Sequence, residues 1–420
     1  MTADVIVIGA GASGMMAAYF AAQEGASVLV LDKNGKSGKK LRITGKGRCN
    51  LTNNCDVQGV MANIPGDGRF LYSALTAFPP ENVMRFYEEL GLPLKTERGK
   101  RVFPQSDNAN DVADILQRAC KKSGAVFQQT LVKGLSVRDG RIAGVKTEAD
   151  TVSCASCIVC TGGLSYPLTG STGDGYRFAK SMGHTVSALR PSLVPLESDD
   201  PCCGRLQGLS LRNVELRVYE NDRLLCREQG EMLFTHYGVS GPLVLSASSR
   251  MRHIGSAQYR LEIDLKPALD DRTLDLRIQR DLAKYHNRSF RNALCDLVPH
   301  VLIPELERLC EAPEDLPANG VTRELRQKLL HSLKAFPIPV TGMRPFAEAI
   351  VTSGGVSTKE IDPRTMRSKI VEGLYFAGEV LDLDAYTGGF NLQIAWATGR
   401  LAGISAGKYS IMNRQDDTEQ

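Results

Sequence analysis

No apolar run in this sequence approaches the roughly 20 residues that a membrane-spanning helix needs. Internal repeats and low-complexity tracts are also lacking. An apolar content of 42% with a charged content of 23% is that of an ordinary globular protein. The first strand is expected to begin at Asp4, which leaves no room for a secretory signal. We therefore predict a cytoplasmic protein with no membrane partner, whose 420 residues suffice for more than one domain.

Little in the sequence indicates disulfides or a metal site. Its 11 cysteines are expected to stay thiols, because the cytosol is reducing. Cys154, Cys157 and Cys160 have the close spacing of a metal site, but they fall on a predicted strand, where successive side chains point to opposite faces. Cys157 then faces away from the other two, and we predict no metal. The vicinal Cys202 and Cys203 are expected in a loop.

Charge is nearly balanced, with a net charge of +4, yet basic residues gather after the predicted second strand. Residues 33–48 contain no acid, and their basic members are Lys33, Lys36, Lys39, Lys40, Arg42, Lys46 and Arg48. This segment is expected to cover the carboxyl ends of the strands, where ligands bind in open α/β sheets. Two interpretations stay open: these residues neutralise cofactor phosphates, or they hold a polyanion such as RNA.

The most informative motif spans residues 4–32, which predict a strand, a glycine turn, a helix and a second strand ending in an acid. Gly9 permits the tight turn, Gly11 lets the backbone approach a pyrophosphate, and Gly14 lets the helix pack closely on the strand. The helix N-terminus then presents free N–H groups to the phosphates. Asp32 lies where a carboxylate accepts hydrogen bonds from a ribose. The motif therefore predicts a dinucleotide site.

The order of the predicted elements indicates one cofactor domain interrupted by an insertion, because a second glycine loop leading into a helix occurs near the C-terminus at 388–391. We assign residues 1–190 and 340–410 to the host domain, 191–270 to an inserted β-rich domain, 271–339 to an inserted helical domain and 411–420 to a tail. The predicted fold class is α/β, with a Rossmann-like host domain.

Individual elements follow from periodicity and turn residues. Helices are expected at about 80–90, 111–122, 273–285, 289–309 and 323–333, and hairpin turns at Asp139–Gly140 and Asn221–Asp222. Residues 39–53 have no clean period and predict a long ordered loop, which is usually functional. The last helix is expected to end near Ser405.

Together these residues resemble the two-dinucleotide-binding-domain flavoproteins, and within them the BaiN/RdsA family, also known as aminoacetone oxidase-like FAD-binding enzymes. The resemblance covers almost the full length. It rests on Gly9-x-Gly11-x-x-Gly14, on the sequences TGKGRCNLTN at 44–53 and TGG at 161–163, on GEMLFTHYGVSGP at 230–242, and on FAGE at 376–379 with GGFNLQ at 388–393.

The resemblance implies a glutathione-reductase-like host domain that holds FAD tightly. The first glycine turn would hold the pyrophosphate, Asp32 the adenosine ribose, and residues 131–133 the adenine. Gly378 and Glu379 would contact the second phosphate and the ribityl chain, and the flavin ring would lie near 388–392. The expected cofactor-binding residues are Gly9, Gly11, Ser13, Gly14, Asp32, Lys33, Arg42, Gly47, Arg48, Asn50, Val132, Thr161, Gly162, Gly163, Gly378, Glu379, Gly389, Phe390, Asn391 and Leu392.

Two side chains are candidate catalytic proton donors. Arg48 is expected to lower the pKa of Cys49, which would then protonate one carbon of a double bond while the flavin delivers hydride to the other. The alternative is a cysteine packed under the loop. His236 is the second candidate, since histidine titrates near neutral pH, and a structural histidine is its alternative.

The resemblance implies an FAD-dependent oxidoreductase that reduces a carbonyl-activated C=C bond. Its substrate would be a uridine of ribosomal RNA, reduced to dihydrouridine, or a small unsaturated carbonyl compound such as a conjugated keto-steroid (bile-acid) intermediate. Oxidation of a small amine such as aminoacetone and a non-catalytic redox-sensing role are the alternatives. Only one glycine fingerprint is present, so NAD(P)H as electron donor would bind transiently, or another donor would replace it. The oligomeric state is not predicted.

Overall fold

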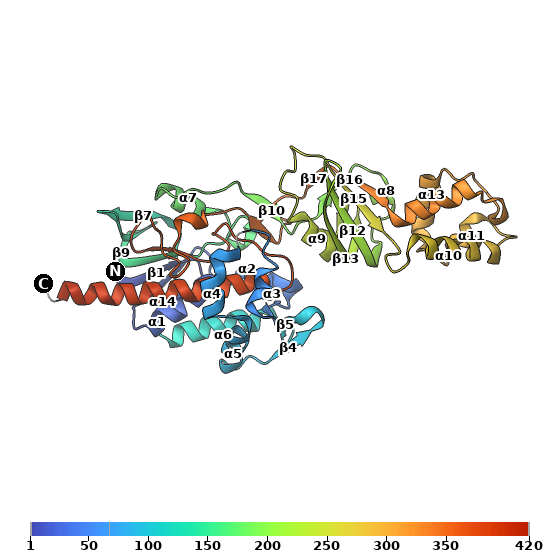
Figure 1. Ribbon diagram of the computed structural model, residues 1–420. Helices are drawn as coiled ribbons and strands as arrows, with labels where there is room; N and C mark the ends of the chain where they lie inside the picture. Colours follow the sequence, from blue (N-terminus) through green and yellow to red (C-terminus); the bar gives the residue numbers. More distant parts are fainter. Residues whose placement is uncertain (1, 67, 419–420) are drawn as a thin grey trace. The chain divides into compact units, whose positions relative to one another are not determined.

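The computed structural model describes residues 2–66 and 68–418, which form two compact units (Figure 1). The host unit comprises the chain up to Ser192 and from Phe346 onward, and the inserted unit comprises Leu193–Pro345. The insertion therefore begins two residues later and ends six residues later than the sequence boundaries of 191 and 339.

The host unit is built on a seven-stranded sheet. Its strands are β1 (Thr2–Ile8), β2 (Val28–Asp32), β6 (Val126–Gln129), β7 (Val132–Arg138), β8 (Arg141–Thr147), β9 (Thr151–Val159) and β19 (Leu374–Phe376). The order is β6-β2-β1-β9-β8-β7, with β19 also paired to β9. Strands β6, β2, β1, β9 and β19 are parallel, and β7–β8 is an antiparallel hairpin. The predicted Rossmann-like α/β fold class is confirmed.

Helices α1 (Ala12–Gln23) and α14 (Phe390–Thr418) lie side by side against this sheet (Figure 1). Gly399, Gly403 and Gly407 recur every four residues and so share the face of α14 that packs on α1. A Cβ at Gly399 or Gly403 would lie 2.4 or 2.3 Å from a backbone oxygen of α1. Glycine therefore sets how closely the two helices approach.

The last helix is longer than the sequence predicts. It continues past Ser405 to Thr418, so residues 411–418 are not a separate tail. Gly407 does not end the helix, because it packs against α1. One turn later the Ser410 hydroxyl donates to the backbone oxygen of Asp4 at 3.1 Å and to Ser156 Oγ at 2.8 Å, which ties the helix to the sheet.

The remaining host elements are the other helices and two small sheets. They are α2 (Lys39–Ile43), α3 (Val57–Met61), α4 (Tyr72–Ala77), α5 (Pro80–Glu89), α6 (Ala109–Lys122) and α7 (Asp174–Ser181), a sheet of β3 (Thr52–Asn53), β5 (Arg101–Pro104) and β4 (Leu94–Glu97), and the pair β10 (Arg190–Ser192) and β18 (Val351–Ser353). Helices α5 and α6 match their predicted ranges. The predicted loop at 39–53 instead begins with a helix, which Gly38 starts from the left-handed region (φ +70°) and which buries Leu41.

The inserted unit is one body with one core, not separate β-rich and helical domains. Its strands are β11 (Leu196–Glu197), β12 (Ser210–Glu220), β13 (Arg223–Thr235), β14 (Gly238–Ser240), β15 (Tyr259–Asp264), β16 (Phe336–Val340) and β17 (Gly342–Met343), all antiparallel. Its helices are α8 (Cys202–Arg205), α9 (Pro242–Ser248), α10 (Asp271–Lys284), α11 (Phe290–Leu294), α12 (Ile303–Cys310) and α13 (Arg323–Lys334).

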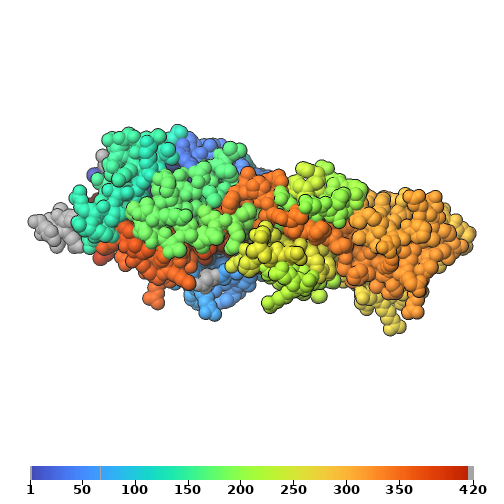
Figure 2. Space-filling view, turned by 90° about the horizontal axis from the view of Figure 1, so that it is seen from above, coloured from blue at the N-terminus to red at the C-terminus, as the bar shows by residue number. Residues whose placement is uncertain are grey.

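Chain order explains this shared core. Strand β16 follows the helices and returns to pair with β15, and Phe336 packs its ring edge-on against Phe234 at 6.4 Å. The helical segment is drawn in gold and orange at the right of the space-filling view (Figure 2). The single helix predicted at 289–309 is wrong. Helix α11 ends at Leu294, and Pro299 lies in the segment between it and α12, which begins at Ile303 with Pro304 in its first turn.

Candidate functional site

The turn between β1 and α1 forms an open cradle made by Gly9, Gly11 and Gly14, which we call the glycine cradle. Gly9 has φ +102°, and a Cβ there would lie 2.6 Å from the backbone oxygen of Cys160. A Cβ on Gly14 would lie 1.8 Å from the oxygen of Gly9. Gly11, by contrast, borders open space and begins α1 without a side-chain cap. The cradle therefore leaves the N–H groups of the helix available to a phosphate.

Asp32 lies beside this cradle at the end of β2. Its carboxylate accepts a hydrogen bond from Ala10 N at 2.6 Å and another from Asn34 N at 2.7 Å. The next residue, Lys33, donates to Asp174 at 2.7 Å. Asp32 thus lies where a ribose-binding acid is expected, whereas the charge of Lys33 is paired within the protein.

Two arginines of the basic segment are also paired within the protein. The buried Arg42 donates to Asp114 at 2.6 Å and to the backbone oxygen of Ser37 at 2.9 Å. Arg48 forms ion pairs with Glu97 and Asp107. Their guanidinium groups therefore hold α2 and the following loop in place. Contact of these two arginines with the cofactor phosphates stays a prediction.

Glu379 is the centre of a polar network that the sequence did not reveal. It follows β19, and its carboxylate accepts from Ser165 Oγ at 2.8 Å, from Thr352 N at 2.9 Å and from Lys40 Nζ at 2.6 Å. Gly378 before it has φ +79°, and a Cβ there would lie 2.4 Å from the Ser13 hydroxyl of α1. The network brings the predicted Gly378–Glu379 segment to the glycine cradle.

Residues 161–163 follow the end of β9 and border the glycine cradle. A Cβ on Gly163 would lie 2.4 Å from Thr352 Oγ1. Gly162 has φ +71°, and a Cβ added there would lie 3.0 Å from Ser171 Oγ. The Thr161 hydroxyl is buried and has no hydrogen-bond partner in the described structure. Buried hydroxyls are normally hydrogen-bonded, so this one fits a site where a bound ligand supplies the missing partner.

The Gly388–Gly389 loop is held by residues of the 44–53 segment. Both glycines have left-handed backbone, with φ +128° and +98°. With its amide oriented to satisfy its neighbours, Asn50 accepts from Gly389 N at 3.0 Å. Asn53 Nδ2 donates to Gly388 O at 3.1 Å. Two motifs more than 300 residues apart, which the resemblance assigns to the flavin region, are therefore in direct contact.

Three further predicted residues lie on this loop and helix. Phe390 is buried and Leu392 is half-buried at the start of α14. The side chain of Asn391 accepts from Ala385 N at 2.9 Å and donates to Ala385 O at 2.7 Å. Asn391 therefore fixes the turn that precedes α14, and its amide is already used within the protein.

Val132 and Gly47 lie at the edge of the site. Val132 is buried and begins β7, and Thr130 just before it donates its N–H to the oxygen of Asp32 at 2.9 Å. Residues 131–133 thus adjoin the predicted ribose position. Gly47 has φ +83° in the turn that follows α2.

The structure corrects the expected reactivity of Cys49. Its side chain is fully buried, and burial raises the pKa of the thiol to about 12, while a hydrogen bond with Thr44 lowers it by less. Arg48 faces Glu97 and Asp107, so its charge does not activate the sulfur. The alternative of a cysteine packed under the loop matches this geometry.

His236 belongs to the inserted unit, whereas the glycine cradle belongs to the host unit. It is exposed in the turn between β13 and β14, and its ring lies edge-on to Tyr237 at 4.9 Å. Its role in proton transfer stays a prediction.

Neither a metal centre nor a membrane span is found in the part of the chain that the structure describes. No three His, Cys, Asp or Glu side chains of residues 2–66 and 68–418 are grouped to hold a metal ion, and no helix there is long and apolar enough to cross a bilayer. Cys154, Cys157 and Cys160 are all buried on β9 or directly after it. Cys202 and Cys203 begin the short helix α8, so their predicted loop is wrong.

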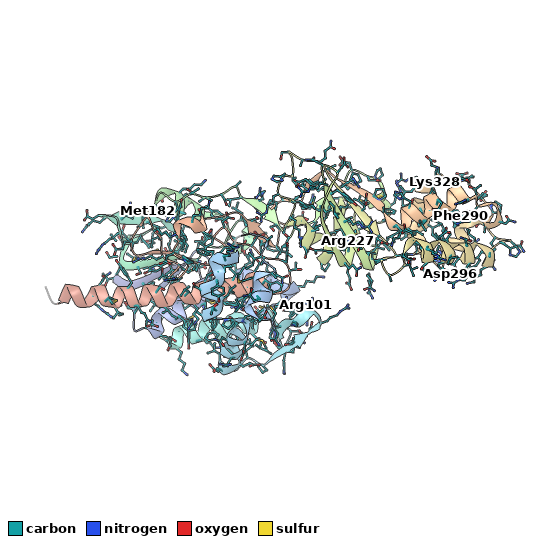
Figure 3. All side chains as sticks on the ribbon, viewed as in Figure 1. Arg101, Met182, Arg227, Phe290, Asp296 and Lys328 are labelled. Carbon is teal, nitrogen blue, oxygen red and sulfur yellow. The ribbon has the colours of Figure 1, made fainter. Side chains whose placement is uncertain are left out.

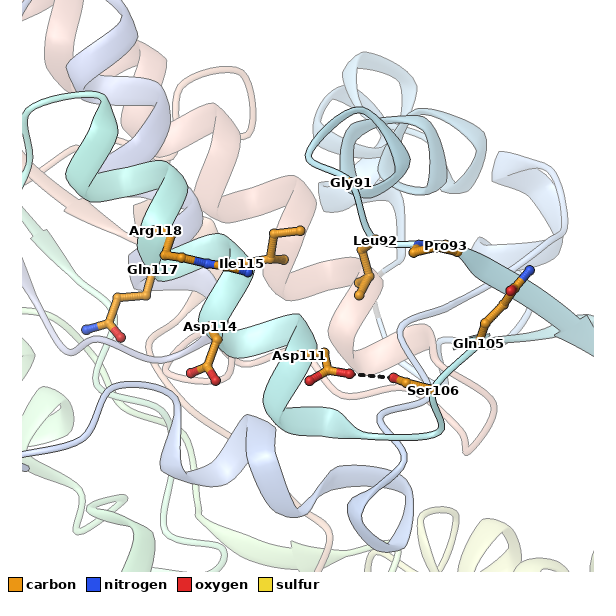
Figure 4. A pocket seen from close by; sticks show the side chains of 10 residues that line it. All are labelled: Gly91, Leu92, Pro93, Gln105, Ser106, Asp111, Asp114, Ile115, Gln117 and Arg118. Carbon is orange, nitrogen blue, oxygen red and sulfur yellow. Dashed lines mark hydrogen bonds between the residues drawn. The ribbon is translucent and has the colours of Figure 1, made fainter.

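A pocket of about 590 Å³ lies beside α6 (Figure 4). Its lining residues are Gly91, Leu92, Pro93, Gln105, Ser106, Asp111, Asp114, Ile115, Gln117 and Arg118. Asp111 accepts from Ser106 Oγ at 2.6 Å, and Asp114 pairs with Arg42. None of the predicted site residues lines this pocket.

The arrangement around the cradle fits a bound dinucleotide. Open space adjoins Gly11, the start of α1 has no side-chain cap, and Thr161 has an unpartnered buried hydroxyl. The Gly378–Glu379 and Gly388–Gly389 segments border the same region. These residues could hold the phosphates, the ribityl chain and the ring system in turn.

Comparisons with known proteins place this site in a family context. The HI0933-like protein Rossmann domain matches residues 3–405. A 3-dehydro-bile acid delta(4,6)-reductase of Clostridium scindens is 32% identical over 412 residues, covering 95% of this chain and 98% of the relative. A ribosomal RNA dihydrouridine synthase of Escherichia coli K12 is 32% identical over 395 residues, covering 94% and 96%. A solved 3-ketosteroid delta1-dehydrogenase of Sterolibacterium denitrificans is similar in fold, with a TM-score of 0.54, 14% identity, and coverage of 97% of this chain and 99% of that one.

Proposed function

This chain belongs to the HI0933-like protein Rossmann domain family, and on that basis we propose that it is an FAD-dependent oxidoreductase that reduces a carbonyl-activated C=C bond. The observation that carries the proposal is the contact, within one host unit, between the 44–53 segment and the Gly388–Gly389 loop, next to the open glycine cradle. The relatives named above act on a bile acid and on ribosomal RNA, and both names describe reduction of a double bond.

Different residues of the host unit would bind different parts of the cofactor. The start of α1 at Gly11 would bind the pyrophosphate through its N–H groups, and Asp32 would accept hydrogen bonds from the ribose after releasing Ala10 N. Thr161 would donate its unpartnered hydroxyl to the bound group. The backbone N–H groups at the start of α14 would favour negative charge on the ring system.

When bound, FAD supplies a hydride from N5 to one carbon of the substrate double bond. The protein must orient the substrate and provide a proton for the other carbon. Cys49 and His236 remain the proposed donors. A thiol with a pKa of about 12 is protonated at neutral pH, but Cys49 is buried, so donation from it requires the loop at 44–49 to move. His236 is exposed and needs no such movement within its own turn.

The proposed substrates are a ribosomal RNA uridine and a conjugated keto-steroid, because in both the double bond is conjugated to a carbonyl that accepts charge as hydride arrives. NAD(P)H is the proposed electron donor. Reduction by NADH and by NADPH would be compared with reduction by dithionite, and a flavin bleached only by dithionite would exclude the nicotinamide donors.

The test is anaerobic turnover of the purified yellow protein. The flavin is reduced, and the protein is incubated in parallel with unmodified large-subunit ribosomal RNA and with a steroid that carries a carbonyl-conjugated diene. Mass spectrometry is expected to show the gain of a hydrogen pair on one substrate, with flavin reoxidation in step. If the flavin stays reduced with both, C=C reduction is wrong, and turnover of aminoacetone under oxygen becomes the next assay.

A further inference from the structure

The turn between β4 and β5 and the first residue of β5 carry three exposed cations, Arg98, Lys100 and Arg101, which we call the hairpin cations. Arg101 is labelled in Figure 3. Among residues 2–66 and 68–418 no carboxylate forms an ion pair with any of the three. Arg101 donates instead to the backbone oxygen of Arg98 at 3.1 Å. Three positive charges are therefore free to meet a ligand.

The acids of the same hairpin are already neutralised at its base. Glu97 and Asp107 both pair with Arg48, and Lys95 donates to Asp107 at 2.6 Å. Hydrogen bonds from Arg48 and Lys95 lower the pKa of these two carboxyls. The carboxylates therefore stay ionised and remain paired with Arg48 and Lys95. The positive charge of the hairpin is thus concentrated at its turn.

The turn is fixed beside the Gly388–Gly389 loop. Asn53 Nδ2 donates to Gly99 O at 3.0 Å and to Gly388 O at 3.1 Å, so one amide joins the two segments. Asn54 N donates to Lys100 O at 2.7 Å. The guanidinium of Arg101 lies 5.8 Å from the ring centroid of the buried Phe103, whose ring also contacts Arg48. These hydrogen bonds therefore hold the backbone of the hairpin turn next to the proposed flavin site.

We infer that the hairpin cations bind the phosphates of an RNA strand whose uridine enters the proposed site; this rests on the proposed function. A uridine ring is neutral, so an RNA-reducing enzyme must draw most of its affinity from the backbone phosphates. Guanidinium and ammonium groups on one rigid turn match a row of phosphates. A bile-acid-type steroid carries one carboxylate and leaves two such cations unused.

Equilibrium binding tests the inference without turnover. The FAD-loaded protein is titrated into a fluorescent, unmodified RNA hairpin with a uridine-rich loop at several salt concentrations. The variant R98Q/K100Q/R101Q is compared with R138Q/K146Q/K180Q, which removes three exposed cations from β7, β8 and α7 of the same unit. A third variant, R98K/R101K, keeps the charges. Flavin absorbance and the melting temperature verify that each variant is folded.

The hairpin variant is expected to bind RNA more weakly and to lower the slope of log affinity against log salt by about 2, since each single-strand phosphate contact contributes about 0.7. The β7–β8–α7 control and the lysine variant should keep most of the wild-type slope. Equal slopes for the hairpin variant and the control would overturn the inference. So would a hairpin variant that binds RNA normally but loses affinity for a carboxylated steroid. Wild-type protein that binds RNA through the hairpin cations yet reduces no substrate would instead refute the proposed function alone.

Discussion

Lys40 Nζ lies 2.6 Å from the carboxylate of Glu379, although 339 residues separate them in the sequence. This ion pair joins α2, at the start of the basic segment, to the loop after β19. About a fifth of each side chain is exposed, so the pair is only partly screened by solvent. The pair therefore connects the N-terminal and C-terminal parts of the host unit at the proposed cofactor site.

Breaking this pair should loosen the site. Glu379→Gln would leave Lys40 with Ser165 alone and weaken the contact to Thr352 N, and we expect lower FAD retention and a lower melting temperature. A double-mutant cycle with Lys40→Met should give a coupling of about 0.5–3 kcal/mol, as for residues in one network. Additive effects of the two substitutions would contradict the pairing. Chemical denaturation of the FAD-loaded protein gives the free energies of unfolding for the cycle, and flavin absorbance after gel filtration gives FAD retention.

Gly389→Ala should damage the site more than a comparable substitution elsewhere. The added Cβ would lie 2.4 Å from the backbone oxygen of Thr52, at φ +98°. Gly91 has a similar φ of +92° but open space around it, so Gly91→Ala carries only the left-handed backbone cost of about 1–2 kcal/mol. We expect Gly389→Ala to lose stability beyond that amount, together with bound flavin. Equal losses in the two variants would show that the contact with Thr52 is unimportant.

The pKa of Cys49 predicts a pH dependence of stability at the alkaline end. Burial raises this pKa from an ordinary value near 9 to about 12, so the folded state holds the proton more tightly than the unfolded state. The resulting stability is complete below pH 9 and declines as the pH rises toward 12. Cys49→Ala should therefore flatten the decline in the free energy of unfolding over this interval. Other buried thiols contribute too, so the slope is compared with that of Cys295→Ala, whose side chain is partly exposed.

Cys49 also gives a direct test of its catalytic role. A buried thiol with a raised pKa should resist alkylation by iodoacetamide in the folded protein at neutral pH. Peptide mass mapping after brief labelling is expected to leave Cys49 unmodified. Rapid labelling of Cys49 upon addition of substrate would instead show that the 44–49 loop opens, and would favour Cys49 over His236 as proton donor.

The lowered pKa of His184 predicts how stability changes at acidic pH. Its ring is buried between Glu360 and Ser368 and lies edge-on to Phe376 at 5.0 Å. Burial lowers the pKa of His184 below its ordinary 6.5, and Glu360 offsets this only in part. The stabilisation is therefore present above pH 6.5 and is lost as the pH falls through the lowered value. His184→Gln should show a smaller fall in melting temperature over this range; an unchanged fall would assign it to other groups.

Much of the host fold could be predicted from the sequence, because its signals are local. The glycine turn at Gly9–Gly14 and the hairpin at Asp139–Gly140 each depend on backbone conformations that few other residues adopt. The family expected from the motifs is confirmed by the match over residues 3–405.

The side-chain partners could not be predicted, because they depend on contacts distant in sequence. Arg42 and Arg48 looked available for phosphates, but Asp114, Glu97 and Asp107 neutralise them, and nothing local marks those acids as partners. Glu379 was expected at the cofactor, yet its partners Ser165 and Thr352 come from separate segments. The hairpin cations lie 50 residues beyond the basic run at 33–48, and nothing local to Arg98, Lys100 and Arg101 marks them as a site.

The glycine face of α14 has a consequence for how the molecule is made. Helix α1 leaves the ribosome well before its packing partner at 399–407, because the chain is translated from its N-terminus. The inserted unit comprises residues 193–345, so it can form its core while α1 still lacks its packing partner. Helix α1 therefore reaches its final packing only after residues 399–407 have been translated, and flavin capture should follow that point.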